Sequence, residues 1–95
     1  MTEASDIFET NTRLRFDALM IDSRVGLTFA TLASEAASGS EKRIRNQANA
    51  RRAYDAVLRA SDDTSFTESQ TQELAGKMKV LKSALEALGE GFPPS

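Results

Sequence analysis

Apolar residues in the last third of the chain recur in steps of four and three, the spacing of one face of an α-helix. The run stops at Gly89, and Pro93 and Pro94 prevent its continuation. Ahead of the run, Thr67 and Gln70 match a capping box, in which each side chain bonds the backbone N–H of the other residue. The pattern therefore predicts a helix over 68–88, with this apolar line: Leu74, Met78, Leu81, Leu85 and Leu88.

The first third of the chain has helical spacing over a longer distance. It predicts a helix over 6–37, which ends where Gly39 suits a left-handed turn and Ser40 can cap the next helix. The apolar surface is too wide for one stripe, so we expect this helix to be covered on more than one side. One line of apolar residues comprises Ile7, Leu14, Ala18, Ile21, Val25, Phe29, Leu32 and Ala36, and it is widened by Phe8, Phe16, Leu19, Met20, Leu27, Ala30 and Ala33.

Gly26 lies in the middle of this predicted helix, where glycine is up to ~1 kcal/mol less favourable than alanine. Close approach of a neighbouring helix would explain its presence, and so would a kink. We favour close approach.

The second helix is predicted over 41–60. Its inner face carries Ala50, Ala53 and Val57, and its solvent face carries Arg45, Arg52 and Arg59 at seven-residue spacing. Short loops make successive helices antiparallel neighbours. We therefore predict an all-α, antiparallel three-helix bundle with a long first helix, forming a single domain over 1–95 with flexible ends at 1–5 and 90–95.

The composition excludes several kinds of chemistry. The chain has no His and no Cys, which removes histidine general bases, cysteine nucleophiles, disulfides and Cys/His zinc sites. It also has no glycine-rich phosphate loop, and its carboxylates fall mostly on polar helix faces. We expect a protein that is not an enzyme and binds no cofactor or metal. The lack of cysteine and of an apolar leader or membrane span favours a cytoplasmic location.

The predicted lengths of the helices do not match. The first spans roughly 48 Å and the other two roughly 30 Å each, which leaves about 18 Å at the N-terminal end without a partner. Exposed apolar clusters usually mark partner surfaces, so we expect a homo-oligomer formed through this end. The alternative is a break near Asn11 and Thr12 that folds residues 3–10 back over the bundle. The residues expected in the interface are Ile7, Phe8, Leu14 and Phe16.

The charge is unevenly distributed, although the net charge is only −2. Residues 41–60 carry six basic and two acidic side chains, between two acidic segments. The line of Arg45, Arg52 and Arg59 could contact an acidic protein partner or a nucleic-acid backbone. Nucleic acid is the less favoured of these, because Glu41 and Asp55 are spaced to pair with Arg45 and Arg59, and the only nearby aromatic residue, Tyr54, falls on the inner face.

Residues 44–88 resemble the helical hairpins of tetratricopeptide-like repeats and of microtubule-interacting-and-transport domains. The resemblance is carried by Ala50-Arg51-Arg52-Ala53-Tyr54-Asp55-Ala56-Val57-Leu58, by Phe66-Thr67 and by the leucine-rich last helix. The Trp and Leu-Gly of the tetratricopeptide consensus are missing, and there is no second repeat. The resemblance implies a groove that accepts a partner helix, and it assigns no binding residues.

These observations favour a non-catalytic protein-interaction or assembly module that self-associates through its first helix, with no membrane partner. The alternative is a nucleic-acid-binding protein that uses Arg45, Arg52 and Arg59. For the favoured interpretation, Phe8→Asp combined with Phe16→Asp is expected to give a folded monomer.

Overall fold

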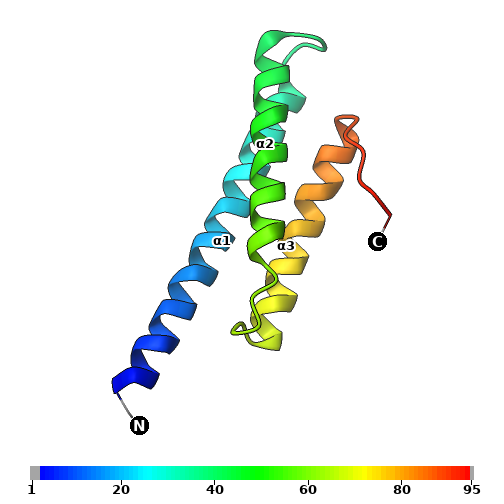
Figure 1. The fold of residues 1–95 in the computed structure, drawn as a ribbon. Helices are drawn as coiled ribbons and strands as arrows, with labels where there is room; N and C mark the ends of the chain where they lie inside the picture. The colour runs from blue at the N-terminus through cyan, green and yellow to red at the C-terminus, as the bar shows by residue number, and fades with distance from the viewer. Residues whose placement is uncertain (1–2, 95) are drawn as a thin grey trace.

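The computed structural model describes residues 3–94, and side chains from Ile7 onwards. It contains three helices, α1 (Glu3–Glu35), α2 (Glu41–Ala60) and α3 (Glu68–Ala87), and no strand within the described part of the chain. Figure 1 shows α1 and α2 side by side, with α3 leaning against the pair and the N-terminal end of α1 extending past the α2–α3 loop. The predicted all-α three-helix bundle is confirmed, and it is elongated, 56 × 25 × 16 Å.

The helix boundaries follow the local capping chemistry. The side chain of Ser40 accepts a hydrogen bond from the N–H of Arg43 (3.1 Å), so α2 begins at the predicted residue. The predicted capping box of Thr67 and Gln70 is present and starts α3. Gly89 has a positive φ of 98° shortly after the end of α3, and Gly39 has a positive φ of 76° in the turn that leads into α2, four residues after the end of α1.

The ends of α1 and α3 differ slightly from the prediction. The α1 helix begins at Glu3 rather than at residue 6 and ends at Glu35 rather than at residue 37. Beyond Glu35 the chain tightens into a turn, where the N–H of Ala36 bonds the carbonyl of Ala33 (3.2 Å). The α3 helix ends at Ala87, one residue before the predicted end.

Gly26 marks the point where all three helices meet. A β-carbon added to it would lie 2.8 Å from Leu81 Cδ2 on α3 and 3.0 Å from the β-carbon of Ala53 on α2. The close-approach explanation is therefore confirmed. Helix α1 continues through Gly26 and also through Asn11 and Thr12, so the alternative of a break that folds residues 3–10 back is wrong.

The core is a single cluster around the apolar line of α3. Leu74, Leu81 and Leu85 are almost completely buried, together with Val57 of α2. Small residues of α1 and α2, including Ala30 and Ala50, allow these two helices to pack most extensively against each other. The bundle end next to the α2–α3 loop is closed by Phe16 and Phe66, whose rings meet edge to face with centroids 6.0 Å apart.

The segment after α3, which was expected to be flexible over 90–95, lies against α2 and contacts it. Arg51 on α2 donates hydrogen bonds to Glu90 (3.2 Å) and to the carbonyl of Gly91 (2.8 Å). The Phe92 ring packs edge to face on Tyr54, with centroids 5.0 Å apart, and lies 4.1 Å below the guanidinium of Arg51. Residues 1, 2 and 95, also expected to be flexible, lie outside the described part of the chain.

Candidate functional site

Helix α1 has a line of large apolar side chains on the face that points away from the bundle. These side chains are between 38% and 61% exposed, although each is Ile, Leu or Val. They recur at steps of seven and four, so they lie above one another on one face of the helix. Ala18, also exposed, lies in the same line. We call this surface the outer stripe: Ile7, Leu14, Ile21, Val25 and Leu32.

A second line on α1 faces the bundle and is buried. It contains Phe16, Leu19, Ala30 and Ala33, with Gly26 between them. The expectation that this helix is covered on more than one side is not met by the described part of the chain, which covers only this inner line. The outer stripe has no cover among the described residues.

The four residues predicted for self-association do not share one surface. Ile7, Phe8 and Leu14 are exposed, as expected. Phe16 is only 8% exposed and contacts Phe66, so placing it on an unpartnered surface is wrong. Phe16 is buried because Phe66, just before the N-cap of α3, packs against it at this end of the bundle. An aspartate at position 16 would bury a charge, so the expectation of a folded monomer from Phe8→Asp with Phe16→Asp is withdrawn.

The unpartnered end of α1 is shorter than the predicted 18 Å. The helix contacts the α2–α3 loop through Arg15, whose Nε lies 3.1 Å from Asp63 Oδ2 and whose Nη2 lies 2.9 Å from Ser65 Oγ. Thr12 is buried beside it and donates to the carbonyl of Phe8 (3.0 Å). Residues 3–11 extend beyond these contacts, which corresponds to about 13 Å of helix.

Sequence reasoning did not assign Ile21, Val25 and Leu32 to the candidate surface. It identified them as helical apolar residues but could not tell which apolar line of α1 faces the bundle. The usable signal was residue size. Between residues 26 and 33, the small residues Gly26, Ala30 and Ala33 match the alanines of α2, as close helix packing requires, whereas Leu32 stays exposed.

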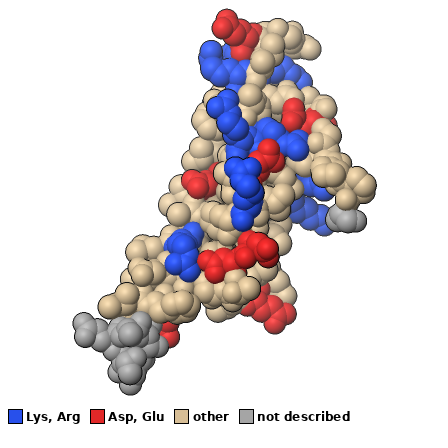
Figure 2. Space-filling model, in the orientation of Figure 1, with Lys and Arg blue, Asp and Glu red and all other residues tan. Residues whose placement is uncertain are grey.

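Arg45, Arg52 and Arg59 are all exposed and follow the length of α2. In Figure 2, Lys and Arg side chains form a column along this helix, with acidic side chains beside it. The expected pairs Glu41–Arg45 and Asp55–Arg59 are absent among the described side chains. Asp55 pairs with Arg51 instead (3.2 Å). Tyr54 is buried, so it offers no ring beside the arginines on which a base could stack.

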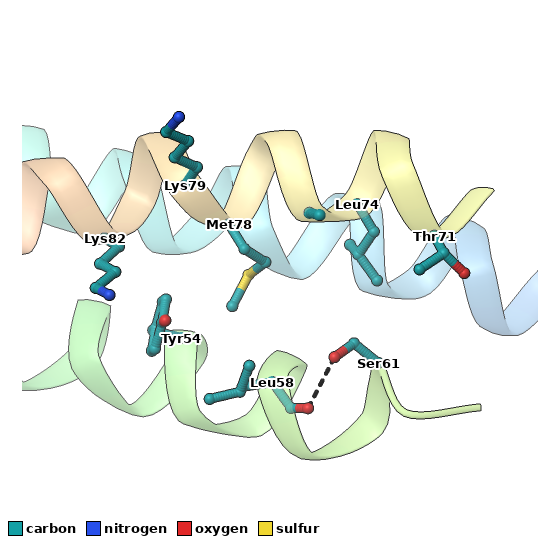
Figure 3. A pocket seen from close by; sticks show the side chains of 9 residues that line it. Tyr54, Leu58, Ser61, Thr71, Leu74, Met78, Lys79 and Lys82 are labelled. Atoms are coloured by element: carbon teal, nitrogen blue, oxygen red, sulfur yellow. Dashed lines mark hydrogen bonds between the residues drawn. The ribbon is translucent and has the colours of Figure 1, made fainter. Parts of the chain in front are cut away.

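A cavity of about 330 Å³ lies between α2 and α3. Figure 3 shows Tyr54, Leu58 and Met78 around it, while Lys79 points away. The hydroxyl of Ser61 is already used, since it donates to the carbonyl of Leu58 (2.8 Å). The lining is mainly apolar and lacks an acid–base pair or a nucleophile with an adjacent base, so the cavity supplies no catalytic machinery.

The pKa of Asp63, a carboxylate of the α2–α3 loop, is lowered. Hydrogen bonds from the hydroxyl and the backbone N–H of Ser65 hold the pKa of Asp63 below its ordinary value of 3.8, with a smaller contribution from Arg15. The contacts of Arg15 with Asp63 and Ser65 connect the loop to α1. Together these hydrogen bonds stabilise the charged form of Asp63.

Among the described residues, no group of three His, Cys, Asp or Glu side chains could hold a metal ion. None of the three described helices is long and apolar enough to cross a membrane.

Comparison with known proteins gives no relative from which a function could be transferred. No family model, no curated protein and no solved structure matches the chain. The function is therefore inferred from the surfaces of the bundle itself.

Proposed function

We propose that this chain is a non-catalytic assembly module that self-associates through the outer stripe of α1. The observation that carries the proposal is a line of five large apolar side chains, all on one face of one helix and all substantially exposed. From Ile7 to Leu32 the line is about 38 Å long. Exposed apolar surfaces of this kind on small domains are typical of protein–protein contacts.

The rest of the bundle is consistent with this function. The described residues offer packing, caps and solvated faces, and none of the candidate sites brings reactive groups together. The absence of cysteine suits a reducing compartment, so the location that we propose is the cytoplasm.

The proposal is tested by measuring molar mass with light scattering from roughly 5 to 500 µM, because self-association depends on concentration. We expect a shift from the 10.3 kDa monomer to twice that mass. Ile21→Glu, at the centre of the outer stripe, should abolish the shift while leaving the helical circular dichroism unchanged.

The matched control is Ile44→Glu on α2. Ile44 is as exposed as Ile21 but lies on another helix, so this variant should associate like the unchanged chain. A monomer at every concentration would refute self-association. Loss of association in Ile44→Glu but not in Ile21→Glu would place the interface on α2.

The alternative function is nucleic-acid binding through Arg45, Arg52 and Arg59. The observation in its favour is that none of these arginines takes part in an ion pair between described side chains. It predicts binding to a random duplex that weakens steeply with salt and is lost in the triple Arg→Gln variant. Binding that is absent at low salt would eliminate this alternative.

A further inference from the structure

The outer stripe is flanked by charges in a specific order. In the heptad that describes the stripe, Asp17 and Arg24 occupy equivalent positions along one edge, and Arg15 and Asp22 occupy equivalent positions along the other. All four residues are exposed. Each edge therefore carries one acidic and one basic residue, one heptad apart, in opposite order on the two edges.

We propose that the outer stripe binds the outer stripe of a second copy of this chain in antiparallel orientation, around a twofold axis at the level of Leu19 and Met20. This inference rests on the proposed self-association and specifies its geometry. A twofold axis makes the interface self-complementary, so each contact occurs twice.

The apolar residues match in this register. Residues whose numbers sum to 39 lie at the same height in the two antiparallel helices. Leu14 then faces the partner's Val25, and Ile7 faces the partner's Leu32. The polar residues of the line coincide as well, since Asn11 faces the partner's Thr28. A polar residue in an apolar seam fixes register when it meets a polar counterpart.

The charges match in the same register. In antiparallel helix pairs, each flanking edge meets the same edge of the partner. Asp17 lies beside the partner's Arg24, and Arg15 lies beside the partner's Asp22. Arg15 already bonds Asp63 within its own chain, but its side chain is still half exposed. Asp17 and Arg24 take part in no ion pair between described side chains, so they provide the sharper test.

Other arrangements bring like charges together. An antiparallel slip of one heptad in one direction places Asp17 opposite the partner's Asp17 and Arg15 opposite the partner's Arg15. A slip of one heptad in the other direction places Asp22 opposite the partner's Asp22 and Arg24 opposite the partner's Arg24. A parallel, in-register pair places Asp17 beside the partner's Asp22 on both sides of the seam. Like charges at such positions destabilise a helix pair, so the charge order selects one register.

The antiparallel pair also accounts for the unpartnered end of α1. Residues 3–11 would lie along residues 28–36 of the second copy, next to its bundle. Phe8 would then approach the partner's Phe29, which is only partly buried within its own chain. In a parallel pair, the two unpartnered ends would contact only each other.

Charge reversal tests the orientation. Asp17→Arg should raise the dissociation constant of the dimer about tenfold, because two attractive pairs become repulsive. Adding Arg24→Asp to the same chain should restore the original value. A parallel pair predicts the opposite result for Asp17→Arg, since the new arginine would meet the partner's Asp22. Tighter association of Asp17→Arg would therefore overturn the antiparallel proposal.

Disulfide formation tests the register directly, because the chain has no cysteine of its own. Leu14→Cys and Val25→Cys should cross-link when the two variants are mixed. Neither should cross-link alone, since each residue lies about 16 Å from its own counterpart along the axis, beyond the reach of a disulfide. Ala56→Cys, exposed on α2, measures random cross-linking.

The outcomes separate the two proposals. A 14–25 disulfide in the mixture alone supports the antiparallel register. Homodisulfides of Leu14→Cys, or an associating mixture that forms no 14–25 disulfide, would overturn it without affecting self-association. If light scattering shows only monomer, the proposed function itself fails.

Discussion

Gly26 of α1 lies so close to Leu81 of α3 that a β-carbon at residue 26 would be 2.8 Å from Leu81 Cδ2. The same β-carbon would be 3.0 Å from that of Ala53 on α2. Leu81 is completely buried. The glycine is therefore required by the packing of three helices, although it weakens the helix that contains it.

We expect Gly26→Ala to lower the free energy of unfolding by about 1–2 kcal/mol. Overpacking typically costs ~1–3 kcal/mol, and better helix propensity returns up to ~1 kcal/mol. The end of Leu81 can rotate, but the Ala53 β-carbon is fixed to its backbone, so α1 and α2 must separate. Urea unfolding monitored by circular dichroism measures the change.

Gly76 provides the control. It lies within α3, and a β-carbon added there would meet nothing within 4 Å. Gly76→Ala should therefore stabilise the protein by about 0.5–1 kcal/mol through helix propensity alone. If both substitutions stabilised the protein equally, the close packing at Gly26 would be contradicted.

The positions of the helices could be predicted because their signals are local. Ser40 and Thr67 cap helices through bonds to residues three positions away, and the line from Leu74 to Leu85 repeats within single turns. Such features depend on neighbours in sequence, and they place a helix end without knowledge of the rest of the fold.

The candidate surface could be predicted only in part, because it depends on how α1 is rotated within the bundle. Both apolar lines of α1 have helical spacing, and periodicity does not say which one is inside. The burial of Phe16 depends on where the α2–α3 loop lies along α1. A shift of the loop by one helical turn, about 5.4 Å, would move it away from Phe16. The expected pair Asp55–Arg59 is absent because Arg51 competes for Asp55, and Arg51 itself binds Glu90 from a distant part of the chain.

Phe16 and Phe8 should respond differently to removal of the ring. Phe16→Ala should lower the free energy of unfolding by about 3–5 kcal/mol, because a buried ring in contact with Phe66 is lost. Phe8→Ala should change it by less than about 0.5 kcal/mol, because this ring is exposed. The comparison is made at low micromolar concentration, where association adds least to stability. A large loss in Phe8→Ala under these conditions would contradict its exposed position.

Phe92 should stabilise the bundle although it follows the last helix. Its ring contacts Tyr54 and lies under Arg51, so Phe92→Ala should lower the free energy of unfolding by about 1–2 kcal/mol. Pro94→Ala is the control, since Pro94 is exposed. Tyr54 is the only tyrosine and the chain has no tryptophan, so its near-ultraviolet circular dichroism reports on this contact. An unchanged tyrosine signal in Phe92→Ala would show that the ring is not held there.

Asp63 should make the stability of the bundle sensitive to acid. The pKa of Asp63 is held below 3.8 in the folded chain by Ser65 and Arg15, so the ionised carboxylate favours folding. This stabilisation is fully present above the unfolded-state pKa and is lost as the pH falls through the lower, folded-state pKa. Thermal unfolding of Asp63→Ala and of the unchanged chain, from neutral pH to about pH 2, measures the difference.

We expect the melting temperature of Asp63→Ala to lie below that of the unchanged chain at neutral pH, and the gap to narrow in acid. It should not close completely, because a protonated carboxyl still accepts a hydrogen bond that alanine cannot. Asp62→Ala tests whether any loop aspartate behaves this way, since exposed Asp62 makes none of the described side-chain hydrogen bonds or ion pairs. A gap that stays constant across the titration would mean that the charge of Asp63 contributes nothing to stability and that its hydrogen bonds with Ser65 are equally strong in both protonation states. A gap that widens in acid would reverse the sign of the linkage and contradict the lowered pKa.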